Sequence, residues 1–510
     1  MPKSFTKGAS ITVKISLLLA LQISNVTFAS ENNSTTSATV LPMASNDKSG
    51  DSFDELMQGF NDTSAAQPSS SPQSDTNNSS NDAELDSLLE GFEDSDSTTS
   101  NEPATTQAEK KWEITTLLSL SSSYSYQQTA PSAGQADYRG LTRLKLKVQP
   151  ELRYKFNSDW DSVFSLSSFY DAAYRLKGRN DFNDEVLDEN ESELEIRELF
   201  IRGTISSALD IKLGRQIVVW GKSDSLRVVD VLNPLDFREP GMVDIEDLRL
   251  PVTMAKVDYY FSNWNLSGIL IPEVRFNKMP PFGSDFYPAG SNKLPTETVP
   301  DHGEKPELAF ALSGNFSGWD LSFHLADFYN DQAHFVKSNN PTLEHARLQL
   351  IGVATNIVSG SWLLKSEVAY IDGLEFANSL DSFSRADAMI GLDYTGIVDM
   401  TFSIEAVNRH LLKYNSNLNS APDDTQENEN QVSFRYTASF LRDKLQSTVL
   451  ATFFGESPDD GGFYRLSFDY EIDDSMSLIF GGITYQSGDS TFLKNIASND
   501  RIFLDYRYSF

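Results

Sequence analysis

The chain has 510 residues, a formal net charge of −32 and no cysteine. The absence of cysteine excludes disulfides, thiolate nucleophiles and cysteine-ligated metals, and the acidic balance argues against a nucleic-acid partner, which requires a basic surface. Hydrophobic residues make up 39% of the chain. No apolar run of about 18 residues follows the N-terminus, which excludes a helical membrane protein. A transmembrane β-barrel stays open, because its strands need apolar residues only at alternate positions.

Residues 1–29 have the pattern of a secretory signal peptide. Lys3, Lys7 and Lys14 precede the short apolar run 15–23, and Ala29 ends a small-x-small sequence. We therefore expect cleavage near Ala29 and export of the mature chain.

Residues 30–111 are rich in Ser, Thr, Asn and Asp and contain 16 acidic residues against three lysines. Such a segment buries too little apolar surface to offset its chain entropy, so we expect a disordered periplasmic tail. Two islands, 53–60 and 85–92, share the pattern Φ-D-x-L-Φ-(Q/E)-G-F, which places apolar residues on one face of a short helix. The islands either arise by chance in a biased segment or dock into a partner's groove. The candidate docking residues are Phe53, Leu56, Phe60, Leu85, Leu88 and Phe92.

From residue 112 to residue 510 the hydrophobic pattern has a period of two. It is clearest in 141–156, where apolar residues alternate with charged ones. A membrane barrel turns the apolar face of such a strand to lipid and the charged face to a wet lumen. The candidate lumen-wall residues are Arg143, Lys145, Lys147 and Arg153.

The pattern predicts an all-β fold, a transmembrane antiparallel β-barrel of about 18 strands (16–18). The expected strands lie at 113–127, 138–156, 160–176, 193–206, 208–217, 252–262, 263–275, 306–317, 318–330, 344–358, 360–373, 385–397, 398–412, 430–442, 443–456, 461–473, 474–488 and 499–510. Every second junction after the first strand is short, and the others are mostly longer and polar. Short turns at one end and long loops at the other, with an even strand number, are typical of bacterial outer-membrane barrels. Both barrel ends and the tail then lie on the periplasmic side.

The last strand ends in alternating aromatic residues, Tyr506, Tyr508 and Phe510. This ending resembles the C-terminal strand of Gram-negative outer-membrane proteins. The resemblance implies that these three residues form the signal read by the barrel-assembly machinery.

The segment 218–251 is too apolar for a solvated loop, and Pro234, Pro240 and Pro251 interrupt it. A long apolar connection in a strand-rich chain must bury its apolar side, so we expect it to fold into the barrel lumen. We expect the apolar residues of 226–232 to form a short helix or strand against the wall, and the charged ones to pair with the lumen-wall residues. The segment is then either a gate that constricts the pore or a plug that only stabilises the fold. The candidate residues are Trp220, Asp224, Arg227, Asp230, Asn233, Pro234, Asp236, Arg238, Glu246, Asp247 and Arg249.

Two elements of this segment, W-G-K-S-D-S-L-R-V-V-D-V-L-N-P at 220–234 and E-D-L-R-L-P at 246–251, resemble a proteobacterial family of uncharacterised outer-membrane barrels. Members of that family carry a similar W-G-x-x-D-x-x-x-x-x-D-x-x-N-P run and an acidic tail with L-x-x-G-F islands. Relatives are often associated with resistance-nodulation-division-type transporters and lipid-carrier-like periplasmic proteins. The resemblance implies movement of a hydrophobic or lipid-like substance across the envelope, with a periplasmic or inner-membrane transporter component as partner.

An embedded enzyme would need a nucleophile, a histidine and an orienting group. None of the five histidines stands at a telling spacing from a serine, and no H-E-x-x-H motif or Walker-type glycine loop occurs. We therefore expect no enzyme, no catalytic residue, no cofactor and no metal centre. Acidic clusters at 181–195, 423–429 and 459–460 are either solvated or bind divalent cations that bridge lipopolysaccharide.

The sequence thus predicts an outer-membrane transport channel for a hydrophobic or amphipathic solute in a Gram-negative bacterium. Its expected partners are outer-membrane lipid and lipopolysaccharide, the barrel-assembly machinery and a periplasmic partner docked by the tail. The alternative is a general diffusion porin, or a structural or adhesin barrel, with no dedicated partner.

Overall fold

The computed structural model describes residues 110–510 except 133, 243–247, 291, 302–304 and 456–459. The expected signal peptide, nearly all of the acidic tail and both docking islands lie outside the described residues.

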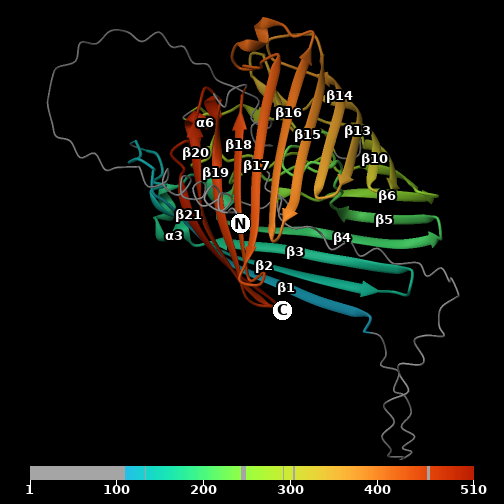
Figure 1. Ribbon diagram of the computed structural model, residues 1–510. Coiled ribbons are helices and arrows are strands. Elements are labelled where there is room, and N and C mark those ends of the chain that lie inside the picture. Colours follow the sequence, from blue (N-terminus) through green and yellow to red (C-terminus); the bar gives the residue numbers. More distant parts are fainter. Residues whose placement is uncertain (1–109, 133, 243–247, 291, 302–304, 456–459) are drawn as a thin grey trace, which may run out of the picture. The chain divides into compact units, whose positions relative to one another are not determined.

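Within the described part of the chain, 18 antiparallel strands form one closed barrel (Figure 1). β1 pairs with β2 on one side and with the last strand, β21, on the other, which closes the ring. The expectation of an all-β barrel of about 18 strands is confirmed. The barrel strands are β1 (Trp112–Ser125), β2 (Gly140–Lys155), β3 (Trp160–Asp171), β4 (Ser192–Ser206), β5 (Leu209–Gln216), β6 (Val252–Phe261), β7 (Trp264–Ile271), β9 (Glu307–Phe316), β10 (Trp319–Tyr329), β13 (Arg347–Ser359), β14 (Trp362–Leu374), β15 (Phe383–Ile397), β16 (Met400–Leu412), β17 (Asn428–Phe440), β18 (Leu445–Phe454), β19 (Gly461–Asp473), β20 (Met476–Ser487) and β21 (Arg501–Ser509).

Short elements occupy the longer connections between strands. They are the helices α3 (Ala173–Leu176), η2 (Arg179–Asp181), α4 (Asp184–Asn190), η3 (Ser416–Asn419) and α6 (Thr491–Ile496), and a small sheet of β8 (Thr296–Glu297), β11 (His334–Val336) and β12 (Thr342–Glu344). None of the described helices is long and apolar enough to cross a membrane.

Two strands end four or five residues earlier than the sequence pattern predicts. The strand expected at 160–176 stops at Asp171, whose carboxylate accepts the backbone N–H groups of Leu144 and Ala173 at 2.9 Å each and so ends the ladder. The strand expected at 263–275 stops at Ile271, because the proline at 272 has no N–H to donate.

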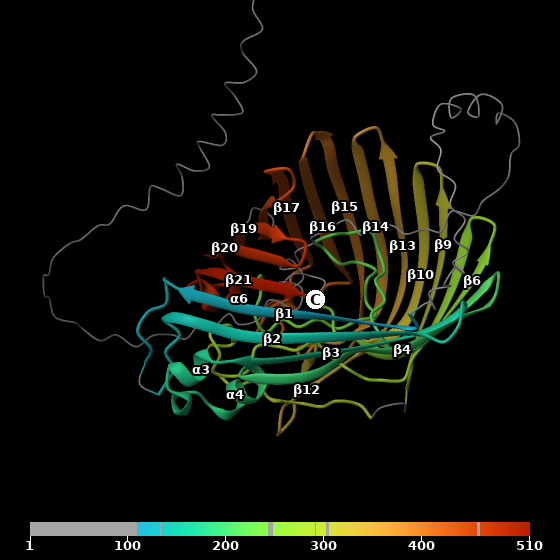
Figure 2. The same cartoon turned by 90° about the horizontal axis from the view of Figure 1, so that it is seen from below.

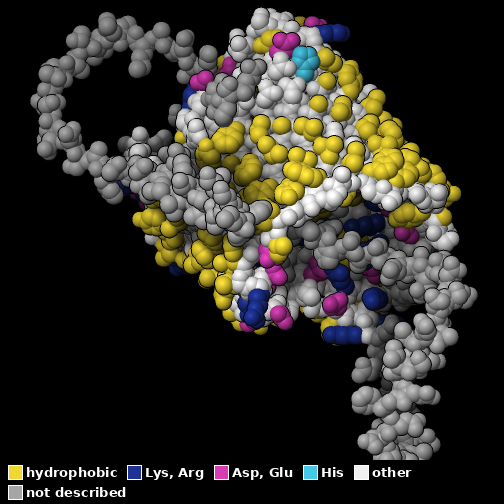
Figure 3. All heavy atoms as spheres, in the orientation of Figure 1, with side chains coloured by type: hydrophobic (Ala, Val, Ile, Leu, Met, Phe, Trp, Pro, Cys, Tyr) yellow, Lys and Arg dark blue, Asp and Glu magenta, His cyan; other side chains and the backbone are white. Residues whose placement is uncertain are grey.

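The outer face of the barrel carries large apolar side chains. On four neighbouring strands, Phe310, Leu325, Ile351 and Tyr370 are cross-strand partners in one row, and they are 43–61% exposed. In Figure 3, hydrophobic side chains cover a broad area over the strands on the visible face. An apolar outer face on a closed antiparallel barrel matches the hydrocarbon region of a membrane.

The adjacent positions on the same four strands point inward and are also apolar. Ala309, Ala326, Leu350 and Ile371 form the neighbouring row, and each is at most 7% exposed. These strands therefore do not share the charged inner face expected for 141–156. The physical reason is that another part of the chain covers this section of the wall.

The two ends of the barrel differ as expected. Turns of two to four residues join β2 to β3, β4 to β5 and every second pair thereafter, whereas the other connections run from 6 to 35 residues. β1 begins and β21 ends at the short-turn end, where Thr116 and Phe510 exchange two backbone hydrogen bonds of 2.9 and 3.1 Å. Tyr508 and Phe510 stack there with ring centroids 5.4 Å apart, and Phe510 is 66% exposed.

Candidate functional site

The connection 217–251, called here the lumen loop, joins β5 to β6 at the long-connection end. Figure 2 shows green chain inside the ring of strands. Its described residues between 217 and 235 form neither helix nor strand, so the expectation of a short helix or strand at 226–232 is wrong. Two isolated bridges, Leu235 to Arg249 and Asp236 to Lys278, are its regular backbone pairing within the described residues. Its amides must therefore find partners elsewhere.

Two buried carboxylates of the barrel wall supply those partners. Glu405 on β16 is 2% exposed and accepts the backbone N–H groups of residues 224, 225 and 226 at 2.8–3.2 Å. It also accepts the Ser223 hydroxyl at 2.8 Å. Glu367 on β14 is 1% exposed and accepts N–H groups of Lys222, Ser223 and Val229. The two side chains thus hold an irregular backbone against the wall by charge-assisted hydrogen bonds.

Lys365 balances part of this negative charge. It is 3% exposed, and its ammonium lies 2.8 Å from the Asp393 carboxylate and 3.7 Å from that of Glu405. It also pairs with Asp224 of the loop. A second ion pair joins the loop to β10, with 2.6 Å between Lys222 Nζ and Asp320 Oδ1. Buried charges require such compensation, because an unpaired one is expensive to desolvate.

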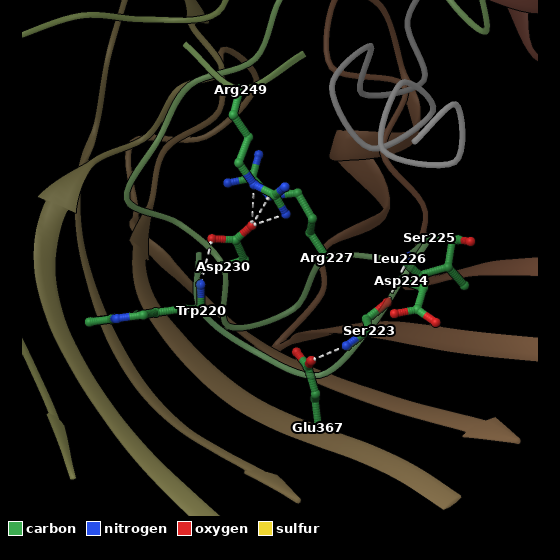
Figure 4. Close-up of a pocket in the computed structure, with 9 residues that line it drawn as sticks. All are labelled: Trp220, Ser223, Asp224, Ser225, Leu226, Arg227, Asp230, Arg249 and Glu367. Carbon is green, nitrogen blue, oxygen red and sulfur yellow. Dashed lines mark hydrogen bonds and ion pairs between the residues drawn. The ribbon is translucent and has the colours of Figure 1, made fainter. Parts of the chain in front are cut away.

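Asp230 organises the inside of the loop. One of its oxygens accepts the Trp220 N–H at 3.2 Å, and the other lies 3.3 Å from Arg227 Nε and 2.9 Å from Arg249 Nη2. Figure 4 shows both guanidinium groups converging on this carboxylate, while the Trp220 ring points away from them. The side chain of Asn233 accepts the Val218 N–H and donates to the Leu250 carbonyl, so both ends of the loop are tied together.

Two glycines make the close approach possible. Gly221 has a φ of +84°, and a Cβ there would lie 2.6 Å from the Glu367 carboxylate. Gly352 on β13 faces the loop, and a Cβ there would lie 2.6 Å from Val229 Cγ1. A Cβ at Gly221 would displace the Glu367 carboxylate, and one at Gly352 would displace the Val229 side chain.

The apolar residues of the loop pack against different parts of the ring. Leu226, Val228, Val229 and Leu232 join a cluster with wall residues of β6 to β16. The later loop residues Leu235, Phe237, Met242 and Leu248 join a second cluster with β18 to β21 and α6. The lumen loop therefore crosses the barrel from one side of the wall to the other.

Charged contacts complete the crossing on β2 and β4. The Glu239 carboxylate lies 2.5 Å from Arg143 Nη2 and 3.1 Å from Lys145 Nζ, both on β2. Arg238 lies 2.8 Å from Glu193 on β4 and 2.5 Å from Asp236 of the loop. Burial alone would raise the pKa of the Glu239 carboxyl, but the charges of Arg143 and Lys145 outweigh it and hold that pKa well below its usual range.

Most of the candidate loop residues contact each other or the barrel wall, whereas some candidate wall residues do not contact the loop. Pro234 is buried, and its carbonyl accepts the Leu250 N–H at 2.7 Å. Glu246 and Asp247 lie outside the described residues. On the wall, Arg143 and Lys145 contact the loop. Arg153 instead pairs with Glu151 on its own strand at 2.6 Å, near the short-turn end.

Sequence reasoning missed the wall residues that hold the loop. Glu367, Glu405 and Lys365 stand in the middle of strands, and nothing distinguishes them there except a charged residue at an inward position. Glu239, which pairs with the expected basic wall residues, lies in the loop sequence but was not singled out. A carboxylate at an inward position in the middle of a strand is the signal that would have found the first two.

His324 on β10 faces the lumen and contacts both the loop and a serine. Its ring centroid lies 4.8 Å from that of Trp220, and its Nε2 lies 2.9 Å from Ser322 Oγ. This pairing is not evident from spacing alone, because side chains two positions apart lie on the same face only in a strand. The Ser322 hydroxyl donates to the Ala354 carbonyl at 3.3 Å, and His324 Nδ1 has no hydrogen-bond partner among the described residues. The pair thus lacks the orienting group of a catalytic triad.

No group of three or more His, Asp or Glu side chains among the described residues is arranged to hold a metal ion.

A closed antiparallel barrel with an even strand number, an apolar outer face and a chain segment folded into its lumen is the architecture of bacterial outer-membrane barrels. The chain belongs to the family described as "Protein of unknown function (DUF1302)", which matches residues 57–510. The expected membership of a family without an established function is confirmed.

Several solved structures are similar to this chain. Acinetobacter baumannii OccAB2 is 11% identical, with 78% of this chain and 97% of that chain covered and a TM-score of 0.44. Pseudomonas aeruginosa OccK9 (OpdG) is 12% identical, with the same coverage and a TM-score of 0.47. A loop L8 deletion mutant of the Vibrio cholerae outer membrane protein OmpT is 8% identical, covers 79% and 100%, and has a TM-score of 0.38. A comparison with curated proteins found no match.

The ion pairs of Glu239 should make the folding stability of the protein depend on pH. Because its pKa is lowered in the folded protein, its pairing stabilises the fold above its unfolded pKa of about 4.3 and is lost as pH falls toward the lower folded value. We expect Glu239→Gln to lower the free energy of unfolding by about 2 kcal/mol at pH 7. The difference from wild type should shrink progressively below about pH 4.3.

Urea unfolding in detergent between pH 3 and pH 7 measures this difference. Glu471→Gln, at an exposed position near the short-turn end of β19, is the matched control and should leave stability unchanged. A Glu239→Gln deficit that stays the same at pH 3 and at pH 7 would contradict the assignment.

Proposed function

We propose that this protein is an outer-membrane transport channel whose pore is set by the lumen loop. The observation that carries the proposal is that one loop contacts β10, β14 and β16, then β18 to β21, and then β2 and β4. A barrel of 16 to 18 strands leaves an aqueous channel unless something fills it. A segment fixed at so many points around the ring therefore decides how much of that channel stays open.

We further propose that the solute is hydrophobic or amphipathic. Support comes from the family resemblance and from the apolar residues Ile217 to Trp220 of the loop, which line a cavity beside the wall. A general diffusion pore for polar solutes gains nothing from an apolar lining, which favours the dedicated channel over the general porin. A structural or adhesin barrel would not need a loop tied across its lumen by buried ion pairs.

The acidic tail is proposed to dock a periplasmic partner through the islands 53–60 and 85–92. Their matching Φ-D-x-L-Φ-x-G-F pattern supports this, and so does the position of β1, whose start at the short-turn end follows the tail directly. The family resemblance suggests a transporter of the resistance-nodulation-division type as the partner. The signal peptide, recognition of the C-terminal strand by the barrel-assembly machinery, and contact with lipopolysaccharide belong to the same proposal.

Planar-bilayer conductance of the barrel with and without residues 222–248 tests the channel. We expect the wild type to be closed or narrow and the deletion to raise conductance about threefold or more, because the unfilled barrel is wide. Retained resistance of the folded barrel to detergent unfolding is the control for the deletion. Large, steady conductance in both proteins would make the loop peripheral and favour a plain porin.

Capture of periplasmic and inner-membrane proteins by residues 30–111 tests the tail. We expect the wild-type tail to retain a partner that the double variant Phe60→Ala, Phe92→Ala loses, since each substitution removes the last apolar residue of a docking face. A double Ser→Ala variant at Ser69 and Ser70, between the islands, is the matched control. Equal recovery by the wild-type tail and the double Phe variant would refute docking through the islands.

A further inference from the structure

A cavity of about 350 Å³ lies between the start of the lumen loop and the inner wall. Side chains of β5, β6, β7, β9 and β10 form its wall side, and residues 217–222 form its loop side. A volume of this size is at the lower end of the range for sites that bind small organic molecules.

Two lysines of the cavity stand directly opposite each other. Lys212 on β5 and Lys256 on β6 are cross-strand partners, and both side chains line the cavity. Like charges directly opposite destabilise a sheet. Lys256 is compensated by Asp258, 2.5 Å away. Lys212 forms no ion pair among the described residues and instead lies over the Phe200 ring, 3.8 Å from its centroid. The pair therefore places positive charge in the cavity that the protein itself does not fully neutralise.

Other polar side chains line the same space. Lys222 reaches it from the loop side, and Ser267, Ser322 and His324 reach it from the wall. His324 is 3% exposed, and its Nδ1 has no hydrogen-bond partner among the described residues. No Asp or Glu is among the lining residues. The ammonium groups of Lys222 and Lys256 pair with Asp320 and Asp258, which do not line the cavity, whereas that of Lys212 has no ion pair among the described residues.

The remaining part of the cavity is apolar. Ile217, Val218, Val219 and Trp220 lie on the loop side, and Ala311 lies on the wall between Ser267 and His324. The cavity thus has a cationic side and an apolar side within one small volume. Such a division matches a molecule with a charged head and an apolar body.

We propose that this cavity binds the carboxylate of a small amphipathic acid, with the ammonium groups of Lys212 and Lys256 on the head and the Ile217–Trp220 edge of the loop on the apolar body. The inference rests on the proposed channel function and names the chemical class of its solute. The bound carboxylate would relieve the repulsion between the two lysines, and its body would contact the same loop that narrows the pore.

Isothermal titration calorimetry of the full chain in amphipol tests the site without any flux. The probes are hexanoate, hexan-1-ol and inorganic phosphate. We expect hexanoate to bind the wild type about tenfold more tightly than hexan-1-ol, because charge-assisted hydrogen bonds hold its head. The double variant Lys212→Gln, Lys256→Gln should lose about tenfold in hexanoate affinity, and the charge-preserving Lys212→Arg, Lys256→Arg should keep most of it.

Lys155→Gln removes the same charge at an exposed position at the end of β2 and should bind hexanoate like the wild type. If the double Gln variant does not fold, Lys212→Gln alone is measured, since its ammonium has no ion pair to lose. Equal affinity for hexanoate and hexan-1-ol, or no loss in the Gln variants, would overturn the proposal. Phosphate that binds as tightly as hexanoate would make this an inorganic-anion site and overturn it as well.

Conductance of the same preparations separates this inference from the channel function. Selective hexanoate binding in a barrel that does not conduct even after loop deletion would contradict the channel but uphold the site. Conductance that responds to loop deletion, without selective hexanoate binding, would uphold the channel and refute the site.

Discussion

The arrangement depends on two wall glutamates that accept the backbone amides of an irregular loop. A chain segment without helix or strand leaves its N–H groups unpaired, and burying them without partners is costly. Glu367 and Glu405 together accept six such amides and one hydroxyl, all between residues 222 and 229. With this interaction in place, the loop can lie in the lumen without regular structure of its own.

The same interaction explains why the wall is apolar on both faces over part of the ring. Once the backbone is anchored, Leu226, Val228 and Val229 are pressed against β6 to β16, and the inward positions there need apolar partners rather than water. Gly352 removes the side chain that would block Val229. Farther along, Arg238 and Glu239 reach β4 and β2, where the wall is charged and the contacts are ion pairs. The wall is therefore apolar where apolar loop residues cover it and charged where charged loop residues cover it.

Much of the barrel could be predicted from the sequence, and much of the site could not. The strands follow from a period of two and from the alternation of short and long junctions, both of which are local properties. Strand ends are harder to predict from hydrophobicity. Hydrogen bonds to the Asp171 side chain end one strand, and the proline after Ile271, which has no N–H, ends another, although the apolar pattern continues in both. The contacts of the loop join residues as far as 245 positions apart, as with Pro240 and Tyr485. Such pairings follow from closure of the ring, which no local pattern encodes.

The charged residues of the loop show the same contrast between local patterns, which can be predicted, and distant contacts, which cannot. The many charged residues of the loop predict ion pairs with β2. Which of them forms these pairs depends on where the loop crosses the lumen. Glu239, rather than the expected carboxylates, contacts Arg143 and Lys145. The apolar run 226–232 was expected to be regular because such runs usually bury their amides in helices or strands. Here two wall carboxylates satisfy the amides instead, and regular structure is not needed.

We propose that anchoring by these two glutamates holds the pore narrow. Single-channel conductance of the double variant Glu367→Gln, Glu405→Gln tests it most directly, with Glu471→Gln as the matched control. A glutamine side chain has the same shape but brings an N–H group toward amides that need an acceptor, so the loop should leave the wall. We expect a folded barrel whose conductance is clearly larger than, or flickers unlike, that of the wild type and the control. A folded double variant with the wild-type conductance would contradict it.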